Sequence, residues 1–349
     1  MTRVRITVRE LAGRVLLVVV STVLSVGCAE AVFRWYTKLR FEYKSPTSTE
    51  HFVMVRGAQV FAFKPHASGL APGSVDSTRT FPFRANAHGL RDRDRPAKAP
   101  GTTRVLVMGD SYTWGYAVLE DEAYPQVAER LLAERGRPDI DVINGGIPDY
   151  NSRQERQLLE QLMPIYQPDA VFLAYVVNDA EPSTAMDPAP EEVYRHSRSW
   201  FLTEAADRLN RRMFRRQVLP SAKDVVGSNY LDGFNEDSMK WKDSRDAVRE
   251  MRDLCAAAGS HFTILMMPDF TQPFDERYGL GKIHDAVAGW GRELEIPVFD
   301  ILTLFRGEDH TKWFVPWDGH PNAEAHRRIA EFLVGKILEE SALRGPKEN

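Results

Sequence analysis

Short apolar runs alternate with amphipathic segments from residue 101 onward, and this alternation constrains the fold more than any other feature of the sequence. The mainly apolar runs cover residues 105–108, 141–144, 170–177, 261–267 and 297–300. Continuous apolar runs of this kind are typical of strands that are buried on both faces. Because helical patterns separate the runs, the sequence predicts an α/β domain at 101–340 with a parallel five-stranded sheet covered by helices on both faces.

The segments between the apolar runs carry apolar residues at helical spacing. They predict helices near residues 124–132, 152–162, 247–255 and 322–333. Ser152 and Asn322 are expected to cap the second and the last of these helices. Residues 181–240 break the alternation and are interpreted as an insertion. Its arginine-rich stretch, 208–216, is read as a solvated helix face in preference to a lid that contacts anionic lipid.

Residues 1–36 form a separate N-terminal unit. An apolar segment at 15–33 contains Glu30 as its only charge, and Trp35 and Tyr36 follow where interfacial aromatic residues belong. About 20 apolar residues are enough to cross a bilayer. Four arginines precede the segment: Arg3, Arg5, Arg9 and Arg14. The pattern therefore predicts a membrane helix with this arginine-rich tail inside and the rest of the chain outside the cytoplasm.

Two other export signals compete with a retained signal anchor. Ala29-Glu30-Ala31 has the small-x-small form of a signal-peptide cleavage site, and the stretch ending at Cys28 is similar to a lipobox. The retained anchor is preferred. Residues 37–100 are predicted to be an extended connector that packs on the domain, because four phenylalanines would otherwise lie in water: Phe61, Phe63, Phe81 and Phe83.

Composition excludes several classes of protein. Lys and Arg total 45 against 49 Asp and Glu, so the net charge of −4 argues against a nucleic-acid partner. Two cysteines, Cys28 and Cys255, form neither a disulfide framework nor a zinc cluster. We expect no metal and no organic cofactor.

Polar residues with catalytic potential stand where the predicted strands end. Ser111 follows the first strand, Asn178 the third, and Asp318 and His320 lie near the C-terminus. Carboxyl ends of parallel strands form the ligand crevice in such sheets. There, His320 could activate Ser111, Asp318 could orient His320, and Asn178 could donate to an oxyanion. Singly, each residue is equally compatible with a cap, turn or surface role.

Taken in order, these motifs resemble the SGNH/GDSL hydrolases. Gly109-Asp110-Ser111 matches the first block, Asn178-Asp179 the third and Asp318-Gly319-His320-Pro321 the last. The stretch 86–92, Asn-Ala-His-Gly-Leu-Arg-Asp, is similar to one found upstream in bacterial membrane-anchored members. The resemblance implies a three-layer, flavodoxin-like α/β/α fold, a Ser111–His320–Asp318 triad, and Asn178 as an oxyanion donor.

Two departures from the family pattern bear on function. Asp149 stands where the second block usually has glycine, so only its backbone N–H matches that oxyanion donor. Asp318 lies two residues before His320, where many members have three. The shorter spacing resembles periplasmic members that acetylate polysaccharides. The Gly-x-Ser-x-Gly elbow does not fit, because Thr113 replaces its last glycine.

The expected function is hydrolysis of acyl esters, carried by a small molecule or a cell-surface glycan, outside the cytoplasm at the bacterial inner membrane. Alternatives are an O-acyltransferase that acts on a cell-surface polysaccharide and a catalytically inactive glycan-binding protein with the same fold. A lipid ester is a further possible substrate.

Overall fold

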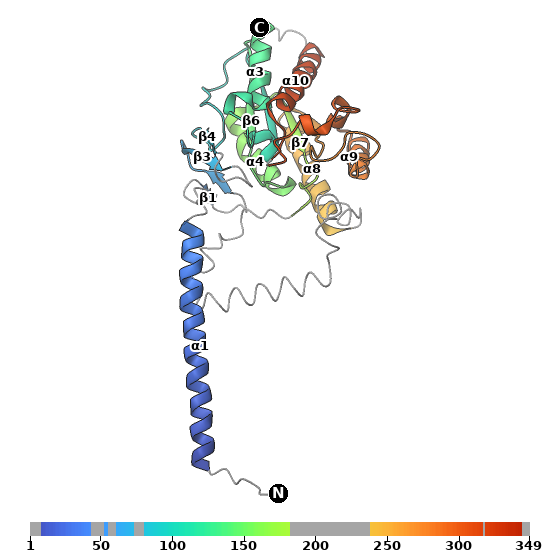
Figure 1. Ribbon diagram of the computed structural model, residues 1–349. Coiled ribbons are helices and arrows are strands. Elements are labelled where there is room, and N and C mark those ends of the chain that lie inside the picture. Colours follow the sequence, from blue (N-terminus) through green and yellow to red (C-terminus); the bar gives the residue numbers. More distant parts are fainter. Residues whose placement is uncertain are drawn as a thin grey trace. The chain divides into compact units, whose positions relative to one another are not determined.

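The structure, a computed structural model, describes residues 8–42, 52–54, 61–72, 80–181, 238–316 and 318–343 (Figure 1). The N-terminal helix belongs to a different compact unit from most of the chain, so the two units are described separately. Nearly all of the insertion predicted at 181–240, with its arginine-rich stretch, lies outside the described residues.

A parallel sheet of five strands forms the centre of the larger unit. The strands are β5 (Thr103–Gly109), β6 (Ile140–Gly146), β7 (Ala170–Tyr175), β8 (His261–Met266) and β9 (Val298–Asp300). Their order is β6-β5-β7-β8-β9, the flavodoxin-like order, which confirms the predicted sheet and fold class. The strand order reverses at β5, so the ligand crevice is expected beyond the carboxyl ends of β5 and β7.

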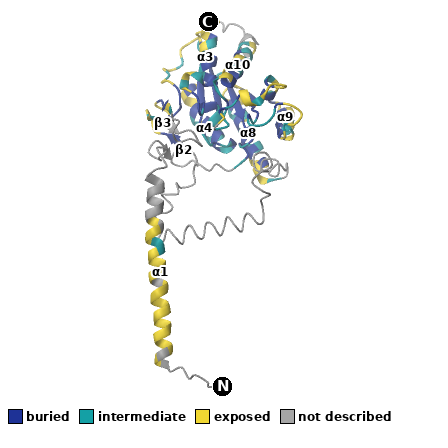
Figure 2. Cartoon of the chain, in the orientation of Figure 1, coloured by how far each residue is buried: buried dark blue, intermediate teal, exposed yellow. Residues whose placement is uncertain are grey.

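Helices cover both faces of this sheet. α3 (Tyr124–Glu134) packs on α10 (Ala323–Leu343), and α4 (Ser152–Tyr166) packs on α8 (Met239–Ala257). Every residue of β7 is buried, as expected for a strand covered on both sides. Figure 2 shows this burial in the sheet and on the inner helix faces.

One of the two predicted helix caps is confirmed and the other is wrong. Asn322 accepts a hydrogen bond from the Ala325 N–H, as its predicted capping role requires. α4 differs, because its cap is Asn151, which accepts from the Gln154 N–H, and Ser152 is the first helical residue. The helix α9 (Gly281–Leu294) was not predicted. Its three glycines weaken the helical signal.

Residues 52–92 contain more regular structure than a connector. β1 (Phe52–Met54) pairs with β2 (Phe61–Phe63), and β3 (Ser68–Pro72) pairs with β4 (Thr80–Arg84), both antiparallel. Phe63 and Phe83 are buried, and their rings lie 5.7 and 5.9 Å from Trp114. These residues therefore complete the hydrophobic core of the larger unit.

The stretch 86–92 holds the chain that follows Ser111. The Arg91 guanidinium is buried and donates to the carbonyl groups of Trp114, Gly115 and Val118 at 2.6–3.1 Å. Asp92 accepts from the Asn144 N–H in β6 at 3.2 Å. A polar stretch far upstream in the sequence thus ties α2 (Ser111–Trp114) to the sheet.

The N-terminal helix, α1, runs from Val8 to Glu42. Its segment Leu11–Val32 has a mean hydropathy of 2.3, and it is long and apolar enough to cross a membrane. Ser21 and Thr22 both donate their hydroxyl hydrogens to the Val18 carbonyl, so their polar groups are satisfied within the helix.

Candidate active site

A cleft of about 360 Å³ opens at the carboxyl ends of β5, β7 and β8, where the strand order predicts a ligand site. Four of the five predicted site residues line it, and Asp149 does not. The complete lining is Asp110, Ser111, Tyr112, Val176, Val177, Asn178, Asp269, Thr271, Asp318, Gly319 and His320.

Ser111 begins the single-turn helix α2 directly after β5. Asp110 caps this helix by accepting the Tyr112 N–H at 2.9 Å. The helix presses so closely on the strand ends that side chains do not fit beneath it. A Cβ on Gly109 would lie 2.1 Å from Thr113 Oγ1, and one on Gly146 would lie 2.3 Å from the Trp114 nitrogen. These two glycines allow the tight turn that places Ser111 at the cleft.

His320 joins Ser111 to Asp318. Its Nε2 lies 2.8 Å from Ser111 Oγ, and its Nδ1 hydrogen-bonds Asp318 Oδ1. The Asp318 side chain is completely buried, whereas the His320 ring is 21% exposed and reaches the cleft. The structure therefore brings these three predicted residues into one hydrogen-bonded chain.

The backbone achieves this arrangement differently from the extended segment that we expected. Residues 315–320 form a turn in which the Asp318 and Gly319 N–H groups donate to the Val315 carbonyl at 2.9 and 2.8 Å. Gly319 has a φ of +91°, which is left-handed. The two side chains meet because the chain turns at a glycine, rather than because they alternate along a strand.

Asn178 lies in the turn after β7 and lines the same cleft as Ser111. Its Nδ2 donates to Asp110 Oδ2 at 3.2 Å. An amide nitrogen carries two hydrogens, so this contact uses one of them. Asp179 closes the same turn by accepting the Val176 N–H at 3.0 Å.

Asp149 occupies the third position of a tight turn. The Tyr150 N–H donates to the Ile147 carbonyl at 3.3 Å, Pro148 is the second residue, and Asp149 has a φ of +64°. Proline followed by a left-handed residue is the signature of a type II turn, in which glycine is favoured at this position. The backbone conformation thus explains the glycine of related sequences, and aspartate is among the residues that tolerate it.

Burial sets the protonation of several groups around the cleft. It raises the pKa of Asp110, although hydrogen bonds from Tyr112 and Asn178 act in the opposite direction. Burial, followed by the charges of Arg91 and His320, lowers the pKa of His326 to about 3. The Tyr124 N–H donates to Nδ1 of His326, so this ring is a neutral acceptor.

Sequence reasoning missed Asp269 and Thr271 in the cleft wall. Both follow β8, so the same rule that found Ser111 and Asn178 applies to them. Tyr116, whose ring lies 4.9 Å from His320, left no comparable signal, because it follows α2 rather than a strand.

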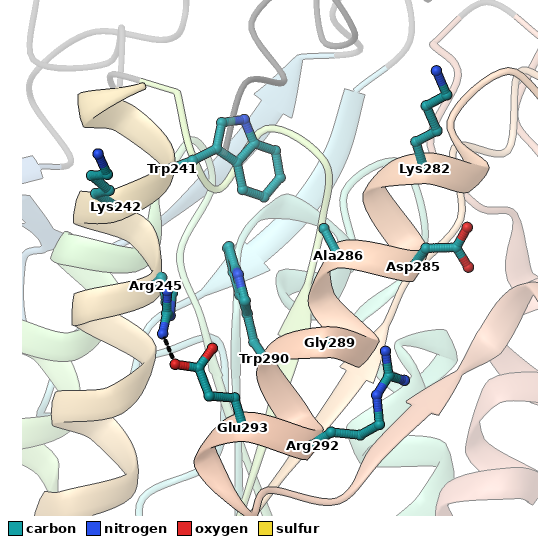
Figure 3. A pocket seen from close by; sticks show the side chains of 10 residues that line it. All are labelled: Trp241, Lys242, Arg245, Lys282, Asp285, Ala286, Gly289, Trp290, Arg292 and Glu293. Carbon is teal, nitrogen blue, oxygen red and sulfur yellow. Dashed lines mark hydrogen bonds and ion pairs between the residues drawn. The ribbon is translucent and has the colours of Figure 1, made fainter. Parts of the chain in front are cut away.

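A second hollow, of about 480 Å³, lies between α8 and α9 (Figure 3). It contains the rings of Trp241 and Trp290 and is bordered by an ion pair between Arg245 and Glu293. None of the predicted site residues lines it. No group of three metal-binding side chains occurs among the residues that the structure describes.

Comparisons with known proteins identify the family of this chain. Residues 107–328 match the GDSL-like lipase/acylhydrolase family. An arylesterase from Vibrio mimicus is 31% identical over 83 residues, which cover 24% of this chain and 41% of that relative. The match thus spans less than half of the relative's length.

Two solved structures are similar at low sequence identity. The psychrotrophic esterase EstA from Pseudoalteromonas sp. is 14% identical with a TM-score of 0.44, over 68% of this chain and 99% of that one. A lipase/acylhydrolase from Enterococcus faecalis is 16% identical with a TM-score of 0.42, over 68% and 95%.

Proposed function

Because this chain belongs to the GDSL-like lipase/acylhydrolase family, we propose that it hydrolyses acyl esters with Ser111 as the nucleophile. The observation that carries the proposal is the hydrogen-bonded chain from Ser111 through His320 to Asp318. A serine hydroxyl needs a neighbouring base to become nucleophilic near neutral pH, and an imidazole held by a carboxylate meets that need.

In the proposed reaction, Ser111 Oγ attacks the ester carbonyl carbon while His320 Nε2 takes the hydroxyl proton. Asp318 accepts the Nδ1–H of His320, which keeps Nε2 free as an acceptor and stabilises the imidazolium. Collapse of the tetrahedral intermediate breaks the bond to the alcohol, which receives the proton from His320. Water then attacks the acyl-serine with His320 as base, and the carboxylic acid and free Ser111 result.

The developing oxyanion needs hydrogen-bond donors on the side of the cleft facing Ser111. We assign the Asn178 amide and the Ser111 N–H to this role, together with the Asp149 N–H. Asn178 lines the cleft beside Ser111, which supports its assignment. Asp149 is supported only by its turn geometry and its place in the family pattern.

The nucleophile is tested with the full chain in detergent and its Ser111→Ala variant. We expect hydrolysis of a short-chain aryl ester and labelling by a fluorophosphonate probe, and both should disappear in the variant. Ser260→Ala serves as the control, because Ser260 directly precedes β8, at the opposite end of that strand from the cleft. If the unmodified protein neither turns over the ester nor labels, the alternative of an inactive glycan-binding protein replaces this proposal.

A cell-surface glycan ester is the substrate class that we favour, with the catalytic part outside the cytoplasm. An N-terminal helix able to cross a membrane supports this location. The two-residue spacing of Asp318 and His320 leaves a sugar hydroxyl as an alternative acceptor in place of water. Incubation of an acyl donor with a glycan acceptor distinguishes the two reactions, because only transfer produces an acylated glycan.

A further inference from the structure

Three buried carboxyl side chains interact with one another: Asp110, which lines the cleft, Glu155 and Asp179. Their exposed fractions are 1, 0 and 2%. They come from the turn before α2, the first turn of α4 and the turn after β7. Among the described residues, the charges that act on Glu155 and Asp179 are those of other carboxylates, whereas the charge of His320 acts on Asp110. Three ionised carboxylates would therefore lie close together without a compensating cation.

Hydrogen bonds distinguish the three groups. Asp110 accepts from the Tyr112 N–H at 2.9 Å and from Asn178 Nδ2 at 3.2 Å, and Asp179 accepts from the Val176 N–H at 3.0 Å. Neither oxygen of Glu155 has a hydrogen-bond partner in the described part of the chain, and Asp179 Oδ1 has none either. A buried carboxylate without donors is strongly disfavoured, so the group with the fewest donors should keep its proton.

Glu155 also lies in the helical turn that supports the Asn178 loop. The Ser152 N–H and hydroxyl both donate to the Asp179 carbonyl, at 3.0 and 3.2 Å, and Asn151 Nδ2 donates to the Glu181 carbonyl at 3.0 Å. Glu155 is three residues after Ser152, on the same side of α4. The start of α4 and the segment that carries Asn178 therefore form one packed unit.

We propose that Glu155 is a positioning residue, held as a neutral carboxylic acid, that keeps the Asn178 turn in place against Asp110. This inference rests on the proposed role of Asn178 as an oxyanion donor. A neutral Glu155 is buried in the first turn of α4, which contacts the Asn178 segment, without adding a charge there. An ionised Glu155 would repel Asp110, and it would oppose the negative charge that develops during ester hydrolysis.

Within the described part of the chain, no group that interacts electrostatically with Glu155 favours its ionised form. The groups that interact with it electrostatically are Asp110 and Asp179 and the hydroxyls of three tyrosines on α3, the loop before α4, and β7: Tyr124, Tyr150 and Tyr175. All of these are neutral or negative. Burial, and then the charge of Asp110, raises the pKa of Glu155 well above its usual range.

A neutral Glu155 has a measurable effect on the pH dependence of stability. Glutamate in the unfolded chain ionises near pH 4.3, whereas in the folded protein it keeps its proton to higher pH. The folded state then binds more protons across this interval, so stability falls as pH rises from about 4.3 through the folded pKa. Glutamine has no proton to lose, so Glu155→Gln removes that loss.

The experiment compares the full chain with Glu155→Gln and Glu155→Ala, and uses Glu160→Gln as a control. Glu160 lies on the exposed side of α4 and pairs with Arg156. Thermal unfolding is measured between pH 5 and pH 8. We expect the melting temperature of Glu155→Gln to rise relative to the unmodified chain as pH increases, with no such trend in Glu160→Gln. The proposal is overturned if the difference in melting temperature between Glu155→Gln and the unmodified chain does not change with pH. It is also overturned if Glu155→Gln is less stable than the unmodified chain at pH 8.

Kinetics with an aryl ester test the positioning role. We expect Glu155→Ala to lower kcat about tenfold or more with little change in KM, since small misplacements of catalytic groups are costly. Glu155→Gln should recover most of that loss. Ionisation of Glu155 should lower the rate of the unmodified chain at alkaline pH, and Glu155→Gln should lack this fall. Equal losses in both variants would overturn the positioning role. Failure of the esterase assignment itself would show separately, as activity that survives Ser111→Ala, and it would leave the unfolding result intact.

Discussion

At the scale of single residues, the contact between Asn178 and Asp110 holds the proposed oxyanion donor next to the residue that precedes Ser111, the proposed nucleophile. Asp110 caps the helix that begins at Ser111, and it also receives one hydrogen of the Asn178 amide. The orientation of the amide is therefore fixed before any substrate binds. Preorganised donors are effective because they need no rearrangement when negative charge develops.

Removal of this amide should affect turnover far more than substrate binding. We expect Asn178→Ala to lower kcat by about 10²–10³, with a small change in KM, since the donor acts mainly in the transition state. Steady-state kinetics on an aryl ester measure both constants. Thr271→Val is the matched control in the same cleft, because its hydroxyl already bonds Asp269. If Asn178→Ala kept the kcat of the unmodified protein, Asn178 would not be an oxyanion donor.

Individual site residues could be predicted from the sequence where they follow a predicted strand or belong to a motif. Ser111 and Asn178 follow strands, and His320 and Asp318 form a motif with them. Glu155 could not be found in this way, because a glutamate in an amphipathic helix looks the same in sequence whether it is exposed or buried. Its environment depends on the Asp179 turn and α8, which lie far away in the sequence.

At the scale of elements, α9 supports the wall of the cleft through a partly buried relay of hydrogen bonds. His284 in α9 contacts Asp300 at 2.8 Å through Nδ1 and the Tyr278 hydroxyl at 3.0 Å through Nε2. Tyr278 in turn accepts the Asp269 N–H at 2.9 Å. The relay connects the end of β9 to the loop that carries Asp269 and Thr271, both of which line the cleft.

The packing of α9 on β9 depends on a glycine. A Cβ on Gly291 would lie 2.3 Å from Val298 Cγ2 and 2.8 Å from the Ile296 carbonyl oxygen. We expect Gly291→Ala to lower the free energy of unfolding by about 1–3 kcal/mol, the usual cost of overpacking. Gly289→Ala is the control on the same helix, because its nearest neighbour is a flexible arginine tip 3.7 Å away.

Chemical denaturation measures both variants. Gly289→Ala should be neutral or stabilising by up to about 1 kcal/mol, because alanine is the better helix former. If Gly291→Ala kept the free energy of unfolding of the unmodified chain, α9 would be able to move away from β9. The same glycines explain why the sequence predicted β9 but not α9. The helical pattern was weakened at the positions where close packing requires glycine.

At the scale of the whole molecule, His326 makes stability depend on pH. Its pKa is lowered to about 3 in the folded protein, whereas an unfolded histidine ionises near pH 6.5. The unfolded state therefore binds more protons between these values, and stability is lost as pH falls below about 6.5. One such group contributes at most about 1.4 kcal/mol per pH unit.

We expect His326→Asn to reduce this acid sensitivity, since asparagine does not ionise and its carbonyl can accept the Tyr124 N–H. The measurement is the change in the free energy of unfolding with pH between pH 6.5 and 5. This slope does not depend on any pH-independent loss of stability caused by the smaller side chain. An exposed histidine, His261, provides the control as His261→Asn. Equal slopes for the unmodified chain and His326→Asn would contradict the assignment.

The fate of the N-terminal helix distinguishes the three export readings. For a retained anchor, we expect the full chain to stay with membranes after an alkaline carbonate wash and to keep its N-terminus. Cys28→Ala should behave identically. A shortened protein released into the soluble fraction would indicate a cleaved signal, and release caused by Cys28→Ala alone would indicate a lipid anchor.

The packing of Phe63, Phe83 and Arg91 on Trp114 has a consequence for how such a chain can be divided during evolution. The alternation of strands and helices begins near residue 101, yet Phe63, Phe83 and Arg91 complete the core and hold the carbonyl groups after Ser111. A recombination event at residue 101 would leave Trp114 uncovered and those carbonyls without their donor. The heritable module is therefore longer than the recognisable family domain, and a functional transplant into another chain would have to carry its upstream segment with it.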